Sequence, residues 1–461
     1  MRGFVPLVIL TVAWGAFAFG AVYPWAYWPL ATASATLGIW GLAGTRSWDD
    51  PRVRRVAWAL IGVAVAIGMQ LVPLPDSWLT HLSPGVDRVL NASVVGFTAS
   101  SRHTLSLAPW STAVVLALFG AFALLLLGLI RSLRLVQLET LVRSLVVLGV
   151  VLALIGVVQA ASLDRNNPLV YGFWAPAYGA TPFGPFINKN HFAGWMVMVV
   201  PVTASYLLAI VATTRPRRDL DFPGMIRWML GARSGGIVIV AVSLLIMMTS
   251  VVLTGSRSGM AGMLLALVVI GLFLWAQPQA EPARGPMISG LAALSAGAVM
   301  WAGLTPVLTR LGYAAGGLSG RWDAWQDTLR IVRDFFMFGT GLGTFARAML
   351  VYQTGDRTSI YAQAHSDYLQ LAAEGGLLVV LPAIAAVGVI GWGIWRRFES
   401  THDDLLTRSL RAGAVAGLVA MAAQSLVEFS LQMPGNTVMF VLLLGIALHR
   451  PHHGLTHAHR V

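Results

Sequence analysis

The chain has 461 residues, of which 57% are hydrophobic and only 11% are charged. Soluble domains carry about 25% charged residues, so this composition excludes an ordinary soluble enzyme and a disordered chain. The mean hydropathy of +0.72 indicates a polytopic, all-α membrane protein. The sequence contains no cysteine, which excludes a disulfide framework and a thiol nucleophile.

Apolar runs set the predicted architecture, because backbone groups that cross lipid must be satisfied within helices. About 20 such residues span a bilayer core. Twelve stretches qualify, in which Pro201 and Pro382 can mark kinks. They are 4–20, 26–44, 56–74, 110–130, 145–162, 192–212, 236–253, 259–276, 287–305, 376–395, 412–430 and 435–449.

Basic residues predict the orientation of these spans. With the N-terminus inside, the inner segments hold 20 Lys and Arg residues and the outer segments 11, six of them in one long loop. Short inner loops of membrane proteins carry the positive excess, so both termini are predicted to be cytoplasmic, including the His-rich tail 450–461. The net charge of +12 is spread between spans rather than gathered in one patch, so we expect no nucleic-acid partner.

One outer segment, 306–375, separates spans nine and ten within what is otherwise a single membrane domain, 1–461. A loop of this length is predicted to be functional and partly folded, with segments 75–109 and 163–191 beside it. Trp322, Trp325, Leu329, Val332 and Phe336 recur at helical spacing, which predicts an amphipathic helix on the membrane surface.

The same loop contains two further features. Arg321 stands at the start of the amphipathic helix and is expected to point into a lipid-facing site, with the charged residues Asp323, Asp327 and Arg330 mostly off the apolar face. The glycines of FGTGLGTF are predicted to form a turn, since a phosphate-binding glycine loop needs a strand before it and a helix after it.

His365 opens HSDYLQLAAEGG, directly before the tenth stretch. In a helix it would share a face with Tyr368 and Leu369, which places the imidazole over apolar packing at the outer interface. Neutral histidine accepts a hydroxyl proton near neutral pH. His365 is therefore a candidate general base, and the alternative is a structural residue that packs the loop.

Cations gather near the same outer edge. Arg257, in TGSRSG, is the one charge between two apolar stretches, so it either faces a cavity or is a snorkelling turn residue. Lys189, the one lysine of the chain, and His191 add positive potential, and Glu428 needs a partner. Such cations suit a lipid pyrophosphate. The sequence offers no convincing carboxylate cluster for a divalent metal, so none is expected.

Six motifs occur in order between about residues 180 and 440: FINKNHFAGW, TGSRSGM, RWDAWQDTLRIV, GTGLGTF, AHSDYLQLAAEGGL and LVEFSLQMPGN. Together they resemble the O-antigen ligase and polymerase superfamily of bacterial envelope glycosyltransferases. The resemblance implies a GT-C-like, all-α protein of the inner membrane, with about twelve transmembrane helices and a large periplasmic loop that contains short helices.

The resemblance also implies a reaction. Members move a glycan from undecaprenyl pyrophosphate to a sugar hydroxyl at the periplasmic face, with inversion and without metal or another cofactor. Ligases use lipid A–core as acceptor, polymerases a second lipid-linked repeat unit, and a third group glycosylates proteins. We expect the ligase type, with an O-antigen or exopolysaccharide polymerase as the alternative.

Site residues follow from the resemblance motif by motif. His365 matches the loop histidine that acts as base, and Arg257 matches the arginine after the seventh span, with catalytic and pyrophosphate-binding roles. Lys189 or Arg321 can stand for a second family arginine. The further expected residues are His191 at the pyrophosphate and, in supporting roles, Tyr368, Glu428 and Asn436.

Two rival functions remain open. A transporter or flippase would favour inverted repeats and ionisable residues at mid-span, whereas the charges here gather at the outer rim. A structural partner in a polysaccharide assembly complex would not require the placed histidine and arginines.

Overall fold

The structure is a computed structural model that describes residues 3–43, 51–94, 96–97, 103–133, 135–162, 169–176, 180–214, 224, 231, 235–276, 281–302, 316–355, 361–399 and 403–450. The first part of the predicted long loop, 306–315, and the tail beyond Arg450 lie outside these residues. The basic inner segment at 215–234 lies outside them almost entirely.

Within the described residues, a helix lies on each of the twelve predicted stretches. These helices are α1 (Phe4–Phe17), α2 (Pro24–Ala43), α3 (Pro51–Met69), α6 (Pro109–Ser132), α7 (Leu135–Ser162), α8 (Lys189–Thr214), α10 (Gly235–Thr254), α11 (Arg257–Trp275), α12 (Glu281–Ala302), α16 (Asp367–Phe398), α17 (Leu405–Gln424) and α18 (Pro434–Leu448). The remaining elements are η1 (Phe19–Ala21), β1 (Pro73–Leu74), α4 (Asp76–Leu82), α5 (Gly85–Ser93), β2 (His103–Thr104), α14 (Gly316–Asp334), α15 (Phe345–Tyr352) and η4 (Ser430–Gln432).

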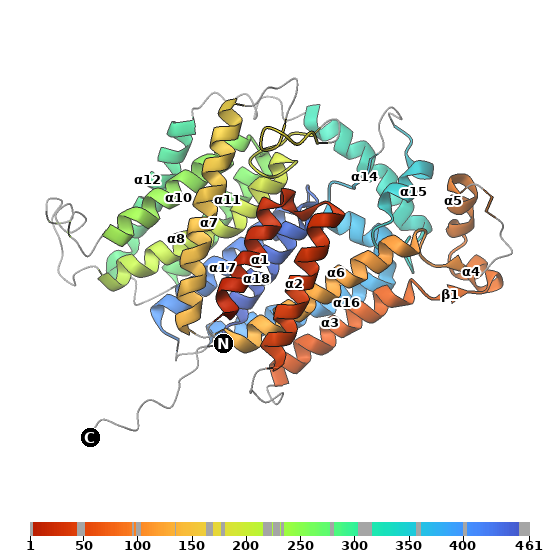
Figure 1. Cartoon of the computed structure of the whole chain (residues 1–461), viewed down its shortest axis with the longest axis horizontal. Coiled ribbons are helices and arrows are strands. Elements are labelled where there is room, and N and C mark those ends of the chain that lie inside the picture. The colour runs from red at the N-terminus through yellow and green to blue at the C-terminus, as the bar shows by residue number, and fades with distance from the viewer. Residues whose placement is uncertain are drawn as a thin grey trace.

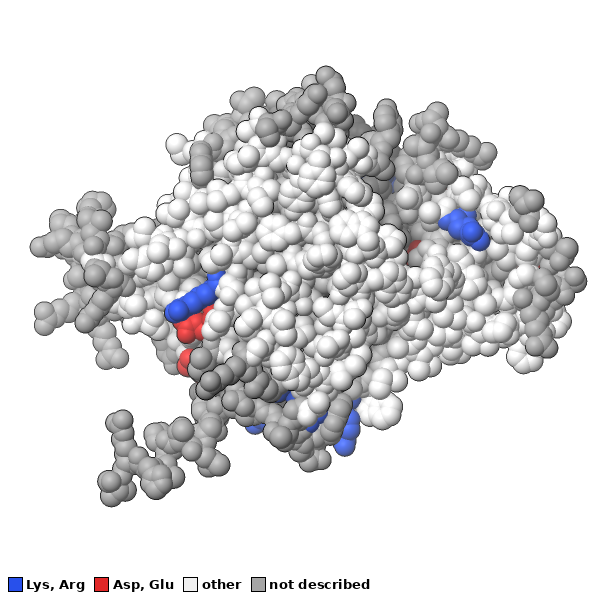
Figure 2. Space-filling model, viewed as in Figure 1, with Lys and Arg blue, Asp and Glu red and all other residues white. Residues whose placement is uncertain are grey.

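Seven of the described helices are long and apolar enough to cross a membrane: α6, α7, α8, α10, α11, α16 and α17. Helices α1 and α18 are apolar but shorter, with 14 and 15 residues. The face shown in Figure 2 is almost wholly uncharged, with its few charged side chains near the edges, as contact with lipid requires. The chain is thus an all-α integral membrane protein, while the number of twelve crossings stays a prediction.

Helix packing centres on α8, whose residues from His191 to Ala209 are buried, and which runs along α17 (Figure 1). One close crossing joins α2 and α6. A Cβ on Gly41 would lie 2.7 Å from the Cα of Gly128, so only glycine permits this approach. Small residues at such crossings are how membrane helices pack without a hydrophobic driving force between them.

Helices α4, α5, α14 and α15 lie together at one end of the molecule (Figure 1). They share a second core, which includes Leu79, Val86, Ile331, Phe335 and Phe345. The prediction that segment 75–109 packs beside the long loop is confirmed by this core. Segment 163–191 divides between two places. Near its middle, the Trp174 indole donates to the Tyr23 hydroxyl of the first helices at 2.9 Å, whereas Asn190 donates to Glu428, the partner of Arg321 in the long loop.

Helix α14 exposes apolar side chains on one face and buries a carboxylate on the other. Trp322, Leu329 and Phe336 from the predicted apolar face are exposed, as a membrane-surface helix requires. Asp327 lies off this apolar face, as expected, and is fully buried on the opposite face. Its carboxylate accepts hydrogen bonds from the backbone N–H and the hydroxyl of Thr354, at 3.0 and 2.8 Å, and so fastens α14 to the chain after α15.

The predicted glycine turn is confirmed and clamps α16. Gly339 has a φ of +68°, and a Cβ there would lie 2.1 Å from the carbonyl oxygen of Glu374. Helix α16 breaks at Gly376, where φ is +56°, whereas Pro382, which could also have marked a kink, lies inside the helix without such a break. The freed N–H groups of Leu377 and Leu378 donate at 2.9 Å to carbonyls of the segment between α14 and the turn. The loop therefore supplies the hydrogen-bond acceptors for the N–H groups that the break frees.

Candidate functional site

The candidate site lies where the loop before α16 meets the starts of α8 and α14 and the link between α17 and α18. His365 precedes α16 and is not on its first turn, because Ser366 caps the helix by accepting a hydrogen bond from the N–H of Leu369. This corrects the expected shared helical face with Tyr368. The φ of His365 is +51°, a left-handed conformation that is costly for a residue with a Cβ and concentrates at functional sites.

Two histidines flank one phenylalanine at this site. The ring of Phe429 packs edge-on against His365, with ring centroids 5.2 Å apart, and against His191, at 4.7 Å. Among the described residues, Nδ1 of His365 and Nε2 of His191 are buried without a hydrogen-bond partner. Buried polar atoms are normally paired, so these nitrogens are candidates for contact with a substrate.

The charge state of His365 follows from its surroundings. Burial, and then the positive charge of Arg321, lower the pKa of His365 from 6.5 to about 4. Burial and a neighbouring cation both disfavour the imidazolium. His365 is therefore neutral at physiological pH and has a lone pair available to accept a proton.

Arg321 forms an ion pair with Glu428, through Nη2 and Oε1. The side chain of Arg321 is 23% exposed and that of Glu428 is 1% exposed. Asn190 donates to the same carboxylate oxygen at 2.9 Å, and the charge of Lys189 also acts on it. Glu428 was expected late in a span, but α17 ends at Gln424, so the carboxylate lies in the link to α18.

The supporting residues hold backbone segments together. The Tyr368 hydroxyl donates to the carbonyl of Ala422 at 2.9 Å. Asn436, which is fully buried, donates through Nδ2 to the carbonyl of His191 at 3.1 Å and so joins the start of α18 to the start of α8. Both contacts fix the frame around His365 rather than the imidazole itself.

Arg257 is the first residue of α11 and is half-buried. The start of α11 packs against the start of α8, since a Cβ on Gly259 would lie 2.6 Å from the Cβ of Ala193. This packing places Arg257 at the same end of the helices as Lys189 and His191. The structure thus brings His365, His191, Arg321 and Glu428 into one cluster and sets Arg257 on the neighbouring helix start.

Three residues that the sequence did not single out complete the cluster. Asp367 accepts hydrogen bonds from the Ser425 hydroxyl at 2.8 Å and from the N–H of Leu431 at 3.2 Å, which fastens the start of α16 to the α17–α18 link. Asn190 donates a hydrogen bond to Glu428, and Phe429 packs against His191 and His365. Each stands next to a residue that was singled out, and that adjacency was the available signal.

A groove of about 520 Å³ adjoins this cluster through Asp367, which lines the groove and donates its backbone N–H to the carbonyl of Glu428 at 3.1 Å; His365 and Arg321 do not line it. Its polar end is formed by Asp367, Tyr368 and Gln370, close after His365. Its walls are apolar and run along α6 and α18, where they include Phe119, Phe122, Leu126, Phe440 and Leu444. The apolar groove therefore lies next to the charged cluster, with Asp367 between them.

Metal ligands do not accompany the site: no group of three or more His, Cys, Asp or Glu residues that could hold a metal ion occurs in the described part of the chain.

Comparison with known proteins gives one relevant match. The family model described as O-antigen ligase matches residues 242–384. This range contains Arg257, Arg321 and His365, and confirms the resemblance that the motifs indicated. A search of curated protein sequences found no match.

Proposed function

We propose that this chain, whose residues 242–384 match the O-antigen ligase family, transfers a glycan from undecaprenyl pyrophosphate to a sugar hydroxyl of lipid A–core. One observation carries the proposal: a neutral, half-buried His365 lies beside Arg321, and Asp367, two residues after His365, lines an apolar groove and donates its backbone N–H to the carbonyl of Glu428, the partner of Arg321. A base, a cation and a lipid channel in one place are what transfer from a pyrophosphate-linked lipid requires.

The donor fits the site in two parts. Its polyprenyl chain would occupy the groove along α6 and α18, whose walls are apolar. Its pyrophosphate would lie among Arg257, Arg321, Lys189 and His191. Arginine is suited to this role because its planar fork grips two phosphate oxygens at once. Glu428 holds Arg321 in place, and Asn436 and Tyr368 hold the segments around it.

The chemical step needs one base and one stabilised leaving group. His365 accepts the proton of the acceptor hydroxyl while its oxygen bonds to the anomeric carbon, and the bond from that carbon to the pyrophosphate oxygen breaks. Attack from the opposite face inverts the anomeric centre. Arg257 and Arg321 stabilise the charge on the departing undecaprenyl pyrophosphate. Bound pyrophosphate also opposes the charge of Arg321, which makes His365 more basic when the donor is present.

His365→Ala tests the proposal most directly. Transfer from undecaprenyl-pyrophosphate glycan to lipid A–core, measured with purified protein in nanodiscs, should fall by about 10²–10⁴, the usual contribution of a positioned base. His81→Ala is the matched control, because His81 is an exposed histidine of α4. A His365→Ala protein that transfers at the wild-type rate would make His365 a structural residue.

The acceptor is tested by the products of cells that lack the protein. Loss of long glycan chains from lipid A–core supports the ligase assignment. Accumulation of single repeat units would instead assign the protein as a polymerase of O-antigen or exopolysaccharide, with a second lipid-linked glycan as acceptor.

The predicted topology, with the site at the periplasmic face of the inner membrane, is checked by a reporter fused near Thr354, which should be active only in the periplasm.

A further inference from the structure

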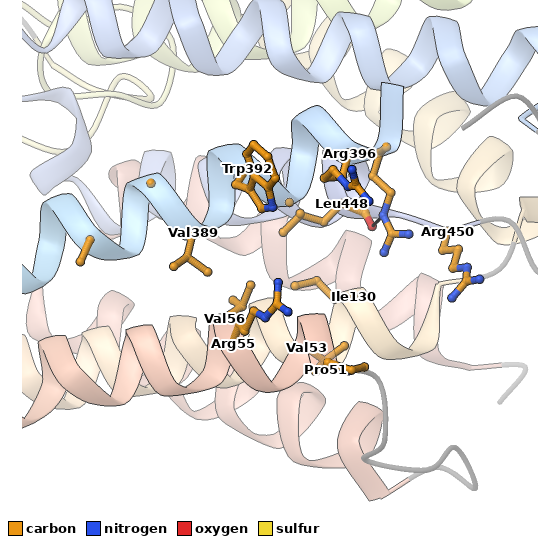
Figure 3. A pocket seen from close by; sticks show the side chains of 14 residues that line it. Pro51, Val53, Arg55, Val56, Ile130, Val389, Trp392, Arg396, Leu448 and Arg450 are labelled. Carbon is orange, nitrogen blue, oxygen red and sulfur yellow. Dashed lines mark hydrogen bonds between the residues drawn. The ribbon is translucent and has the colours of Figure 1, made fainter. Parts of the chain in front are cut away.

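A second cavity, of about 1000 Å³, lies at the far end of α16 from His365 (Figure 3). Its lining on α16 runs from Ala385 to Arg397, and α16 begins at Asp367. At 1.5 Å per residue, this lining starts roughly 27 Å along the helix, close to the ~30 Å thickness of a hydrocarbon core. The cavity therefore opens at the membrane face opposite the candidate site.

The rim of this cavity is cationic. Arg55 on α3, Arg396 and Arg397 on α16, and Arg450 after α18 line it, and the lining that the structure describes includes no Asp or Glu. In Figure 3, Arg55 rises from α3 toward α16, and Arg450 lies beyond Arg396, on the side away from Val389. Arg397 is buried and donates to the carbonyl of Leu448 at 3.2 Å. Arg396 makes an exposed ion pair with Glu399, at 3.1 Å, of the kind that contributes little to stability.

The inner part of the cavity is apolar. Val53 and Val56 of α3, Ile130 of α6 and Val389 of α16 face it, and Trp392 stands near the arginines (Figure 3). Gly388 leaves open space beside Val389, since no atom lies within 4 Å of the position of a Cβ there. A soluble anion would match the rim and leave these walls uncovered. An amphiphile with an anionic head matches both.

We propose that this cavity binds an anionic phospholipid of the leaflet opposite the His365 site. Arg55, Arg396 and Arg450 contact the phosphate of its headgroup, and one acyl chain lies along Gly388 and Val389. Basic pockets between transmembrane helices are a known form of headgroup recognition. The site shares no residue with the proposed transfer reaction, so it stands whether or not that proposal holds.

The charge of the rim is tested by lipid binding to the full-length protein. Native mass spectrometry should show phosphatidylglycerol bound in preference to phosphatidylcholine, and each of Arg55→Gln and Arg396→Gln should weaken that binding about fivefold. Arg54→Gln is the matched control, because Arg54 is exposed on the same turn of α3 and does not line the cavity. Equal binding of the two lipids, or equal loss in the control, would overturn the proposal.

The apolar part is tested by filling it. Gly388→Phe should displace phosphatidylglycerol, whereas Gly391→Phe should not, because both positions have open space around a Cβ and only Gly388 lines the cavity. A competition arm separates the two sources of phosphate. ATP or inorganic phosphate should leave the bound lipid in place, and displacement by either at millimolar concentration would assign the cavity to a soluble anion and overturn the lipid assignment.

Discussion

Two buried ion pairs between an arginine and a carboxylate lie at opposite ends of the helix bundle, and they differ in how completely they are satisfied. Arg411 and Asp403 are 1% and 4% exposed. The guanidinium of Arg411 also donates to three backbone carbonyls at the ends of α16 and α18, those of Arg397, Ala447 and His449. Each nitrogen of this guanidinium donates to a group of the protein, so the pair joins the ends of the helices, and we call it the clamp.

The Arg321–Glu428 pair is left partly open. Arg321 is 23% exposed, and Oε2 of Glu428 is buried with no partner among the described residues. A strained histidine stands beside it. A structural pair saturates its hydrogen-bonding groups, whereas a binding site keeps some for a ligand. We therefore expect the first pair to govern stability and the second to govern transfer.

The largest expected effect is on the clamp. Arg411→Ala leaves Asp403 buried without its partner, which should lower the free energy of unfolding by about 3–5 kcal/mol. Thermal unfolding in detergent measures this, with Arg54→Ala as an exposed control. An Arg411→Ala protein with the melting temperature of the wild type would break the distinction between the two pairs.

The open pair should respond differently. Arg321→Gln should lower transfer by about 10²–10³, the usual effect of removing one group that stabilises transition-state charge. It should also reduce stability, because Glu428 loses its partner. Arg321→Gln combined with Glu428→Gln should recover stability, since no buried carboxylate remains, yet keep the loss of transfer. Recovery of transfer in the double variant would make this pair structural too.

A smaller effect concerns pH. Because the pKa of His365 lies at about 4 in the folded protein, below the ordinary 6.5, transfer should be insensitive to this group above about pH 5 and fall as pH drops through 4. Arg321→Gln removes one cause of the depression, so the acidic fall in kcat/KM should move to higher pH. An unchanged pH profile would show that the charge of Arg321 does not act on the pKa of His365.

The same shift makes a contribution to stability. Between pH 6.5 and 4 the unfolded chain protonates His365 and the folded protein does not, because its pKa in the folded state is about 4. The free energy of unfolding is therefore unaffected by this group above pH 6.5 and decreases as pH falls toward 4. Thermal unfolding across this range should show a weaker acid dependence in His365→Gln than in the wild type. An identical dependence in the two proteins would contradict the assigned pKa.

The smallest expected effect is none. If Arg257 and Arg321 carry the pyrophosphate charge, transfer should proceed in EDTA as fast as in Mg²⁺. Initial rates in the two buffers measure this directly. A loss on chelation that added metal restores would place a metal ion where the open pair is expected to act.

The helices themselves were predictable from local sequence. Apolar runs of about 20 residues have no alternative to helix in lipid, so each predicted stretch contains one. The glycine turn was equally local, because glycine accepts a positive φ that other residues resist. The motifs around His365, Arg257 and Arg321 also indicated, before any contact was known, the resemblance to the O-antigen ligase family, whose model matches residues 242–384.

Only the tertiary structure decided which of these residues meet. Glu428 finds Arg321 across 107 residues of chain, and Gly376 rather than Pro382 breaks α16 because a distant turn supplies its hydrogen bonds. The helical pattern places Asp327 off the apolar face, but only the fold shows that it is buried there, where Thr354 and Arg330 satisfy its carboxylate. Periodicity predicts which face of one helix is apolar. It carries no information about a partner that only folding brings within hydrogen-bonding distance.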